Sequence, residues 1–331
     1  MAGPARRHDH IGGGGQLLAL NRRGPDGALS QTDVTPTVTI GMPVYNSERF
    51  LVQSIESLLN QTYRDFVLVI SDNASTDGTA AICERFARTD PRVRYYRNPE
   101  NIGMNPNFNR VFELTRSRYL KWSTADDYWR PDMLEDAVAI LESDPSICLA
   151  YPRAVLVDRE GRELSRYEDK LHLLQEDPVE RFLTVLAHIR LCNHHLGLLR
   201  TEVIRKTRLF GNYPGADIAF VAEMSLYGKL YQMPKHQLFR RFHEDSSSWQ
   251  RDSDDHQARR FHAARVDRIP FKTWRVHAGM FGSVLRAPLS VRQRARVLGS
   301  LTHRMAWDRR LLGEELFRDL QLFVRRKPRG S

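Results

Sequence analysis

The chain has 331 residues, of which 41% are hydrophobic and 27% charged, and its formal net charge is +10. This length is enough for one substantial domain and a smaller appendage. Three scattered cysteines, Cys83, Cys148 and Cys192, argue against a disulfide or zinc framework. Because no apolar run is long enough to span a bilayer, we expect a cytoplasmic protein, with peripheral contact at the inner membrane face as a further expectation.

The first 35 residues are polar and glycine-rich, and they contain no apolar core of a signal peptide. We expect residues 1–35 to form a disordered tail. From residue 36 onward, short β-rich runs alternate with amphipathic helical patterns, which favours a mostly parallel sheet with helices on both faces. The expected strands are Thr37–Met42, Phe66–Ser71, Arg92–Tyr96 and Tyr119–Ser123.

Three polar segments follow these expected strands, at residues 43–46, at residues 72–78 and at the doublet Asp126-Asp127. In an open sheet of this kind, ligands bind outside the carboxyl ends of the strands. Carboxylates at such a place suit Mg²⁺ or Mn²⁺, which proteins hold with one or two acids plus substrate phosphates. The same doublet, shortly before Pro131, also fits a solvated turn at a helix start.

These segments, in this order, resemble the signature of the family 2 inverting glycosyltransferases of the GT-A fold. The chain has Pro-Val-Tyr-Asn at residues 43–46, Asp-Asn-Ala-Ser-Thr-Asp-Gly-Thr at 72–79 and Asn-Ile-Gly at 101–103, followed by the acidic doublet. The resemblance covers about residues 37 to 245. It implies an α/β, Rossmann-like GT-A fold: a mixed, mostly parallel central sheet flanked by helices, here with a C-terminal helical extension.

The resemblance also implies a division of the chain and an activity. Residues 36–250 would form the GT-A domain, with a nucleotide-binding half at 36–130 and an acceptor half at 131–250, and residues 251–331 a basic helical region. The implied activity is metal-dependent, inverting transfer of a sugar from a nucleotide-diphosphate donor to an acceptor hydroxyl. The acceptor would be a polysaccharide, a glycolipid or another glycoconjugate.

The resemblance places the donor nucleotide against one set of residues. Asp72 would accept a hydrogen bond from the ring N–H of a pyrimidine or guanine base. The alternative for Asp72 is an Asx-turn that closes its loop before Thr79. The residues implied in donor binding are Pro43, Val44, Tyr45, Asn46, Asp72, Asn101, Gly103 and Asp126.

The implied metal, Mn²⁺ or Mg²⁺, would be held by the acidic doublet. We expect Asp127 to bind the ion itself and Asp126 to lie at the ribose or in the water shell of the metal. Thr124 stands where many members of the family have an acid, which predicts weaker metal binding without the nucleotide. His243 is expected at the metal or the diphosphate, although a histidine beside two arginines also fits a surface loop.

Inverting transfer needs a base that takes the proton of the attacking hydroxyl. We expect Asp217 to be that base, because it lies where a Gly-rich loop enters a helix. The alternative is a carboxylate that only stabilises the helix dipole, by about 0.5–1 kcal/mol. Glu223 is the second candidate for the base. The polar run 193–195 either lines the acceptor cleft or forms a satisfied turn.

The basic excess lies in the C-terminal region, where residues 251–331 carry 19 Lys and Arg against 8 Asp and Glu. An apolar stripe runs along the expected helix Arg309–Val324. Such a helix suits an anionic membrane surface where lipid-linked acceptors reside, but also packing on the catalytic domain or a homodimer contact.

Three other functions remain open from the sequence. A nucleotidyltransferase would share the nucleotide-binding sheet, but the expected Gly-rich phosphate loop is missing after Met42. A nucleic-acid-binding module would explain the basic tail, but not the acid-lined edge, so no nucleic-acid partner is expected. A sugar-nucleotide binder without catalysis would explain Thr124.

Overall fold

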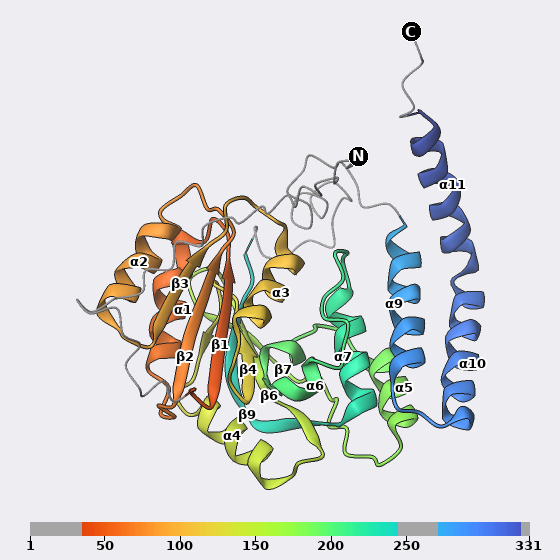
Figure 1. Cartoon of the computed structure of the whole chain (residues 1–331), viewed down its shortest axis with the longest axis horizontal. Helices are drawn as coiled ribbons and strands as arrows, with labels where there is room; N and C mark the ends of the chain where they lie inside the picture. Colours follow the sequence, from red (N-terminus) through yellow and green to blue (C-terminus); the bar gives the residue numbers. More distant parts are fainter. Residues whose placement is uncertain (1–34, 244–270, 326–331) are drawn as a thin grey trace, which may run out of the picture.

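The computed structural model describes residues 35–243 and 271–325, so the expected disordered tail lies almost wholly outside the described residues. The described chain forms an α/β fold around one large sheet (Figure 1). The strands are β1 (Val38–Val44), β2 (Phe66–Asp72), β3 (Val93–Arg97), β4 (Tyr119–Trp122), β5 (Tyr128–Trp129), β6 (Ile147–Val157), β7 (Glu163–Tyr167), β8 (Leu198–Arg200) and β9 (Lys229–Arg241). The helices are α1 (Glu48–Leu59), α2 (Thr79–Thr89), α3 (Met104–Leu114), α4 (Met133–Ser143), α5 (Pro178–His188), the 3-10 turn η1 (His194–Leu196), α6 (Thr201–Ile204), α7 (Ala216–Tyr227), α9 (Lys272–Arg286), α10 (Val291–Trp307) and α11 (Arg309–Arg325).

The sheet runs in the order β3-β2-β1-β4-β8-β6-β9-β5, and β7 pairs with β6 at the side. The strands β3, β2, β1 and β4 are parallel to one another, as are β6 and β9. The strands β8, β5 and β7 run antiparallel to their neighbours. The expected mixed, mostly parallel sheet with flanking helices is therefore confirmed.

Burial explains why the first half of the sheet forms where it does. All seven residues of β2 are buried, which is the pattern of a parallel strand covered on both faces. In α1 the buried residues Leu51, Ser54, Ile55 and Leu58 recur at helical spacing and form the stripe that packs inward. The chain moves outward from β1 to β3 and then returns to β4, so right-handed crossovers put α1 and α2 on one face and α3 on the other.

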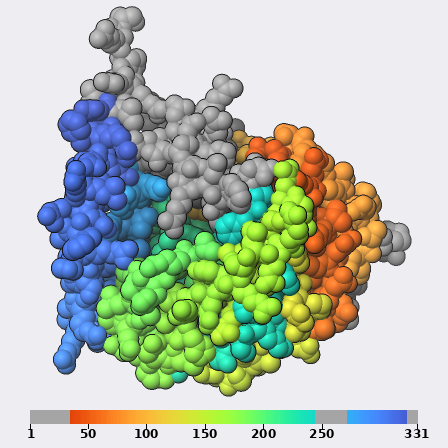
Figure 2. Space-filling view, turned by 180° about the vertical axis from the view of Figure 1, so that it is seen from behind, coloured from red at the N-terminus to blue at the C-terminus, as the bar shows by residue number. Residues whose placement is uncertain are grey.

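The C-terminal helices complete the packing of α7. Nine of the twelve residues of α7 are buried, and a helix that is apolar all round needs neighbours on all sides. The helix α9 packs on α7, and α10 packs on α5 and α9. Figure 2 shows these C-terminal helices (blue) along one edge of the molecule.

The expected apolar stripe of the last helix is only partly used in this packing. Leu312 of α11 is buried, whereas Leu311, Leu316 and Leu320 are exposed. The last helix packs on α9 and α10, and these two helices in turn pack on α7 and α5. Direct packing of α11 on the domain that carries the sheet stays a prediction. Contact with a membrane and homodimerisation stay predictions. Among the described residues, none of the helices has the length and apolar character needed to cross a bilayer.

One glycine shows how closely the second half is packed around the turn η1. A Cβ at Gly197 would lie 2.4 Å from the carbonyl oxygen of Ala150 and 2.7 Å from the Cβ of Tyr151. We expect Gly197→Ala to lower the free energy of unfolding by about 1–3 kcal/mol, because the β6 backbone must shift. Urea denaturation measures this change.

The matched control is Gly299→Ala in α10, where a Cβ would meet no atom within 4 Å. Because alanine is the better helix former, this variant should keep the stability of the parent or gain up to about 1 kcal/mol. Equal effects of the two substitutions would contradict the packing described at Gly197.

Candidate active site

The expected polar segments meet at one edge of the sheet. β1 and β2 pair in parallel so that Val44 lies opposite Asp72, and the loops that follow the two strands are neighbours. β4 pairs with β1 on its other side, and the backbone N–H of Ser123 donates to the carbonyl of Gly41. The carboxyl ends of β1, β2 and β4 therefore bring residues 43–46, residues 72–78 and the acidic doublet to the same edge.

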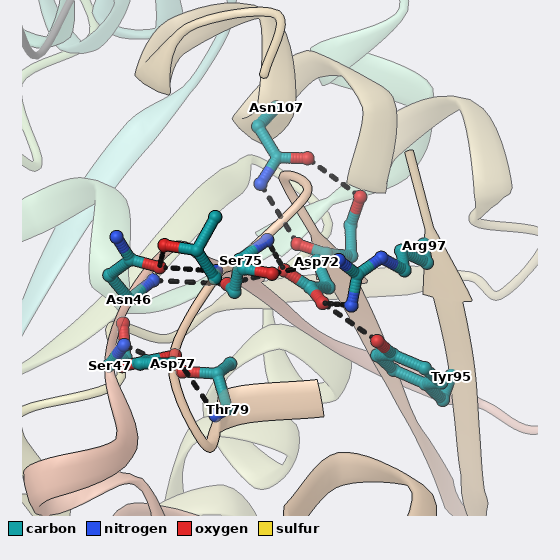
Figure 3. Close-up of polar contacts among 11 residues, drawn as sticks. Asn46, Ser47, Asp72, Ser75, Asp77, Thr79, Tyr95, Arg97 and Asn107 are labelled. Atoms are coloured by element: carbon teal, nitrogen blue, oxygen red, sulfur yellow. Dashed lines mark hydrogen bonds and ion pairs between the residues drawn. The ribbon is translucent and has the colours of Figure 1, made fainter. Parts of the chain in front are cut away.

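Asp72 lies at the centre of a buried network (Figure 3). Its side chain is 0% exposed. Oδ1 accepts from the backbone N–H of Ser75 at 2.9 Å and from the Ser75 hydroxyl at 2.5 Å. Oδ2 accepts from the Tyr95 hydroxyl at 2.7 Å and lies 3.4 Å from Nη1 of Arg97. The loop-closing contact that the sequence left as an alternative is thus present, and base recognition by Asp72 stays a prediction.

The loops after β1 and β2 are also tied to each other. Asn46, which has a positive φ of 47°, accepts from the backbone N–H of Thr76 at 2.8 Å through Oδ1. Asp77 accepts from the backbone N–H groups of Glu48 and Thr79 at 3.2 and 3.0 Å. Tyr45 is different, because 47% of it is exposed and its ring is open to a ligand at this edge.

The remaining residues expected at the donor hold the backbone of the edge. Val44 is buried, and its carbonyl accepts from the backbone N–H of Asn73. Asn101 accepts from the Asn73 side chain at 2.7 Å and from the Gly103 N–H at 2.9 Å. Gly103 has a φ of 92°, which favours glycine at this turn before α3. Pro43 is half-buried within β1.

Both carboxylate oxygens of Asp127 accept hydrogen bonds from the protein. Asp127 is 3% exposed. Its Oδ1 accepts from the backbone N–H of Arg241 at 2.8 Å, and its Oδ2 accepts from the Thr124 hydroxyl at 2.6 Å. Burial and the charge of Asp126 raise the pKa of Asp127 to about 7. Because both oxygens already have donors, this carboxylate stabilises the loop.

Asp126 and His243 form the more accessible pair. Oδ2 of Asp126 lies 3.2 Å from Nε2 of His243, and the aspartate side chain is 30% exposed. The imidazole packs on Phe50 with ring centroids 5.0 Å apart. Burial raises the pKa of Asp126, but the hydrogen bond and charge of His243 outweigh it and lower the pKa.

This pair fits a divalent ion. Carboxylate oxygen and imidazole nitrogen suit Mn²⁺, and two neighbouring ligands of an octahedral ion lie about 3 Å apart. The atoms of Asp126 and His243 have that separation. The geometry therefore favours Asp126, rather than Asp127, as the carboxylate that a metal ion reaches.

The two arginines before His243 have different surroundings. Arg241 is buried, and its guanidinium donates to the carbonyls of Asp126 and Arg159 and to the side chain of Gln53. Arg240 is half-buried and donates to the side chain of Asn193. Arg241 is thus a structural residue that joins three separate segments of the chain.

The charge of Arg240 is felt on both sides of the site. Burial raises the pKa values of Asp127 and Cys192, and the charge of Arg240 opposes the rise at each. Its guanidinium is therefore close enough to Asp127 and to Cys192 to act on both.

Asp217 lies in the first turn of α7, after Gly215, whose φ of 84° turns the chain into the helix. Its carboxylate is half-buried and shares its surroundings with the side chains of Cys192 and His195. Burial lowers the pKa of His195 to about 4, although the charge of Asp217 opposes the shift, so the imidazole is neutral at pH 7. Cys192 was missed as a site residue, and its position beside the polar run 193–195 was the available signal.

Glu223, the second candidate for the base, is buried within the protein. Its Oε1 accepts from Arg286 of α9 at 2.7 Å, and its Oε2 accepts from the backbone N–H of Arg208 at 3.1 Å. Of the two acids on α7, Asp217 is the more exposed, since Glu223 is buried.

The polar run 193–195 divides between two surroundings. His195 faces Asp217. Asn193 instead donates to Oδ2 of the buried Asp169 at 3.2 Å, and the fully buried His194 has its Nε2 4.0 Å from Oδ1 of the same residue. Burial raises the pKa of Asp169 to about 7, against the hydrogen bond from Asn193 and the charge of Arg240.

Comparison with known proteins identifies relatives of this chain. A family model described as glycosyl transferase family 2 matches residues 39–208, which is just over half of the chain. A chondroitin synthase of Escherichia coli is 34% identical over 130 residues, which cover 39% of this chain and 19% of that protein. An uncharacterized glycosyltransferase of Haemophilus influenzae is 28% identical over 222 residues, which cover 64% of this chain and 68% of that protein.

Solved structures share the fold. The crystal structure of residues 1–349 of S. aureus TarS in complex with UDP-GlcNAc has a TM-score of 0.61 at 18% identity, covering 81% of this chain and 72% of that one. The same protein in complex with UDP has a TM-score of 0.59 at 16% identity. The E. coli relative extends far beyond the matched region, whereas the fold match covers most of the chain.

Asp169 provides a test of the buried network around Asn193. Its pKa of about 7 in the folded protein exceeds the unfolded value of 3.8, so between these values the folded state binds more protons. The charge of Asp169 therefore costs stability as the pH rises from about 4 to about 7. Relative to the parent, Asp169→Asn should gain on the order of 2–4 kcal/mol over this range and then level off.

Urea denaturation of both proteins at several pH values measures this difference. The control is Asp177→Asn at the start of α5. Burial raises the pKa of Asp177, but the backbone N–H of Val179 and the side chain of Arg296 lower it by more, so the pKa is below its usual value. Asp177→Asn should therefore lower the free energy of unfolding at pH 7, and this loss should vanish toward pH 3. A parent and an Asp169→Asn variant with parallel pH profiles would contradict a buried, proton-binding Asp169.

Proposed function

Since this chain belongs to glycosyl transferase family 2, we propose that it transfers a sugar from a nucleotide-diphosphate donor to an acceptor hydroxyl, with inversion and with the help of a divalent metal. Glycosyltransferase activity follows from the family. The metal dependence rests on one observation above all, the pairing of Asp126 with His243 at the edge where β1, β2 and β4 end.

The proposed donor site lies along the loops after β1 and β2. The exposed ring of Tyr45 would cover the base. The Asp72 carboxylate is buried and both of its oxygens accept from the protein, so it would accept from a ring N–H of uracil, thymine or guanine once the Tyr95 hydroxyl or Arg97 moves away from Oδ2. The fold match to TarS, whose structures contain UDP and UDP-GlcNAc, supports a nucleotide-sugar donor of this general kind.

The diphosphate would lie between Asp126 and Arg240. A Mn²⁺ or Mg²⁺ ion bound there supplies positive charge that stabilises the leaving diphosphate. Asp126 and His243 would hold the ion, and Asp127 keeps their loop in place through its bond to the Arg241 N–H. The guanidinium of Arg240 adds a second positive charge next to the leaving group.

Asp217 would act as the base. A carboxylate oxygen of Asp217 takes the proton from the acceptor hydroxyl as the hydroxyl oxygen forms its bond to the anomeric carbon of the sugar. The bond from that carbon to the diphosphate breaks on the opposite face, and the electron pair leaves with the phosphate oxygen. One displacement of this kind inverts the configuration, and no covalent nucleophile is needed.

The position of Thr124 is compatible with catalysis. It replaces an acid that many family members carry, but its hydroxyl donates to Asp127 and so supports the doublet.

The proposed acceptor is a glycan or a lipid-linked sugar. Trp307, Phe317, Arg309 and Arg310 are all exposed on the C-terminal helices, and peripheral contact with a membrane stays a prediction.

The metal assignment predicts different outcomes for two neighbouring acids. Calorimetric titration of the parent with UDP, GDP and dTDP should show one nucleotide whose binding tightens with Mn²⁺. Asp126→Asn should weaken that metal-dependent binding by at least about tenfold, because an ion ligand is lost. Asp127→Asn should retain the metal dependence, because its oxygens serve the loop.

A circular dichroism spectrum and a thermal melt establish that each variant is folded before titration. Loss of the metal effect in Asp127→Asn together with its survival in Asp126→Asn would reverse the assignment. Absence of binding to all three nucleotides in the parent would contradict the donor site itself.

The assignment of the base predicts a split between binding and turnover. Asp217→Asn should retain the affinity of the parent for the donor nucleotide but lose transfer by a factor of about 10² to 10⁴, the usual contribution of a positioned base. Donor affinity is measured by calorimetry, and turnover by release of the nucleoside diphosphate in the presence of acceptor.

Glu180→Gln is the matched control, because it also removes one carboxylate charge from the first turn of a helix, on the exposed face of α5. It should leave both measurements unchanged. If Asp217→Asn transferred sugar at the parental rate, another group would have to be the base. If the parent binds the donor but transfers to none of the acceptors offered, a binding protein becomes the better account.

A further inference from the structure

A second group of possible metal ligands lies on the acceptor side of the proposed site. The thiol of Cys192, a ring nitrogen of His195 and a carboxylate oxygen of Asp217 all lie within 4.8 Å of one another. They come from the loop after α5, from η1 and from the first turn of α7. Within residues 35–243 and 271–325, this is the one such group of three His, Cys, Asp or Glu ligands.

The histidine is fixed in place and has unused bonding capacity. Its ring packs edge-on against Phe108 and Phe210, with centroids 6.0 and 5.7 Å away. Its Nδ1 is buried and makes no hydrogen bond of normal geometry, although the backbone of Cys192 lies close enough to oppose the lowering of the ring's pKa. A buried imidazole nitrogen that is poorly satisfied is costly, so its presence in a group with a thiol and a carboxylate points to a ligand.

We propose that Cys192, His195 and Asp217 form a binding site for Zn²⁺, separate from the proposed Mn²⁺ or Mg²⁺ site, and that zinc bound there inhibits sugar transfer. The choice of ion follows from the ligand types. Sulfur, nitrogen and oxygen together suit Zn²⁺, whereas Mg²⁺ and Mn²⁺ prefer sites rich in oxygen. Three protein ligands leave the fourth tetrahedral position to water.

The charges at the site balance when zinc binds. The Cys192 thiol gives up its proton to the solvent, and its thiolate and the Asp217 carboxylate together carry two negative charges. These neutralise the ion and offset the repulsion from the nearby Arg240. No oxidation or reduction takes place.

Zinc is expected to inhibit transfer because Asp217 is one of its ligands. This inhibitory part of the proposal rests on the proposed function of Asp217 as the base. A carboxylate that coordinates zinc has lost the lone pair that would take the proton of the acceptor hydroxyl. Binding itself depends on the geometry of the three side chains alone, so the two halves of the proposal are tested by different measurements.

The binding test uses Co²⁺ as a spectroscopic substitute for Zn²⁺, with the full chain and without nucleotide. We expect a thiolate-to-cobalt charge-transfer band that saturates with one ion per chain and disappears when Zn²⁺ is added. The band should be absent in Cys192→Ser and in His195→Gln. It should persist in Cys148→Ala, which removes another buried cysteine, and in Asp126→Asn, which alters the proposed donor-side metal site.

No such band in the folded parent at saturating Co²⁺, or a band that survives in both Cys192→Ser and His195→Gln, would overturn the site. Two ligand variants are used so that the failure of one to fold does not decide the result. Their near-ultraviolet circular dichroism establishes the fold.

The inhibition test measures sugar transfer at saturating Mn²⁺ as Zn²⁺ is added. Each protein is compared with its own rate in the absence of zinc. Cys192→Ser should need at least about ten times more zinc than the parent for half inhibition, since one of three ligands is weakened. Equal inhibition of both proteins would place the effect of zinc at the donor side and overturn the inhibitory half.

Cobalt bound through Cys192 with transfer unaffected by zinc would also overturn the inhibitory half, and it would count against Asp217 as the base. Absent cobalt binding with normal transfer would overturn the zinc site and leave the proposed function standing. The two failures are therefore distinguishable.

Discussion

The site depends on the way in which Arg241 joins the end of β9 to the acidic doublet. The Arg241 backbone donates to Asp127, and its buried guanidinium donates to the carbonyl of Asp126 at 3.1 Å and to Gln53 of α1 at 2.6 Å. The ring of Phe50 lies 4.5 Å from the guanidinium carbon. His243 follows two residues later and meets Asp126 for this reason. Loss of one partner in such a buried, charged network costs several kcal/mol, because the other partner is left without compensation.

Hydrogen bonding distinguishes two kinds of acid on these elements: those whose oxygens both accept from the protein and those that are more exposed. Asp127 and Glu223 have all their oxygens occupied by donors of the protein. Their neighbours Asp126 and Asp217 are more accessible, one beside His243 and one beside Cys192 and His195. A buried carboxylate whose two oxygens both accept from the protein is held in one orientation, whereas a partly exposed one is open to a ligand. In each pair, the acid with two donors holds in place the element that also carries the more exposed acid.

The C-terminal helices belong to this arrangement as well. An ion pair joins Arg286 of α9 to Glu223 of α7, the helix whose first turn contains Asp217. Tyr213, in the loop before α7, lies against Gly279 of α9. The position of Asp217 therefore depends on residues about 60 to 70 positions further along the chain. The C-terminal helices therefore have a structural role that is independent of their basic charge. They cover α7, which is buried on most sides.

The order of the functional segments could be predicted from the sequence. Runs such as residues 66–70 are apolar and are followed by polar residues, so the strands and the edge at which they end follow from local patterns. The two carboxylates of the doublet are chemically identical and adjacent in the chain, so no local pattern distinguishes them. Arg241, whose backbone N–H donates to Asp127, lies 114 positions further along the chain. Cys192 and His195 lie in a different segment of the chain from Asp217, the third member of their group. Tertiary packing decided which acid of the doublet is more exposed, which arginine is buried and which cysteine lies beside Asp217. Sequence spacing does not encode these features, because hydrogen bonds and burial depend on distant segments of the chain.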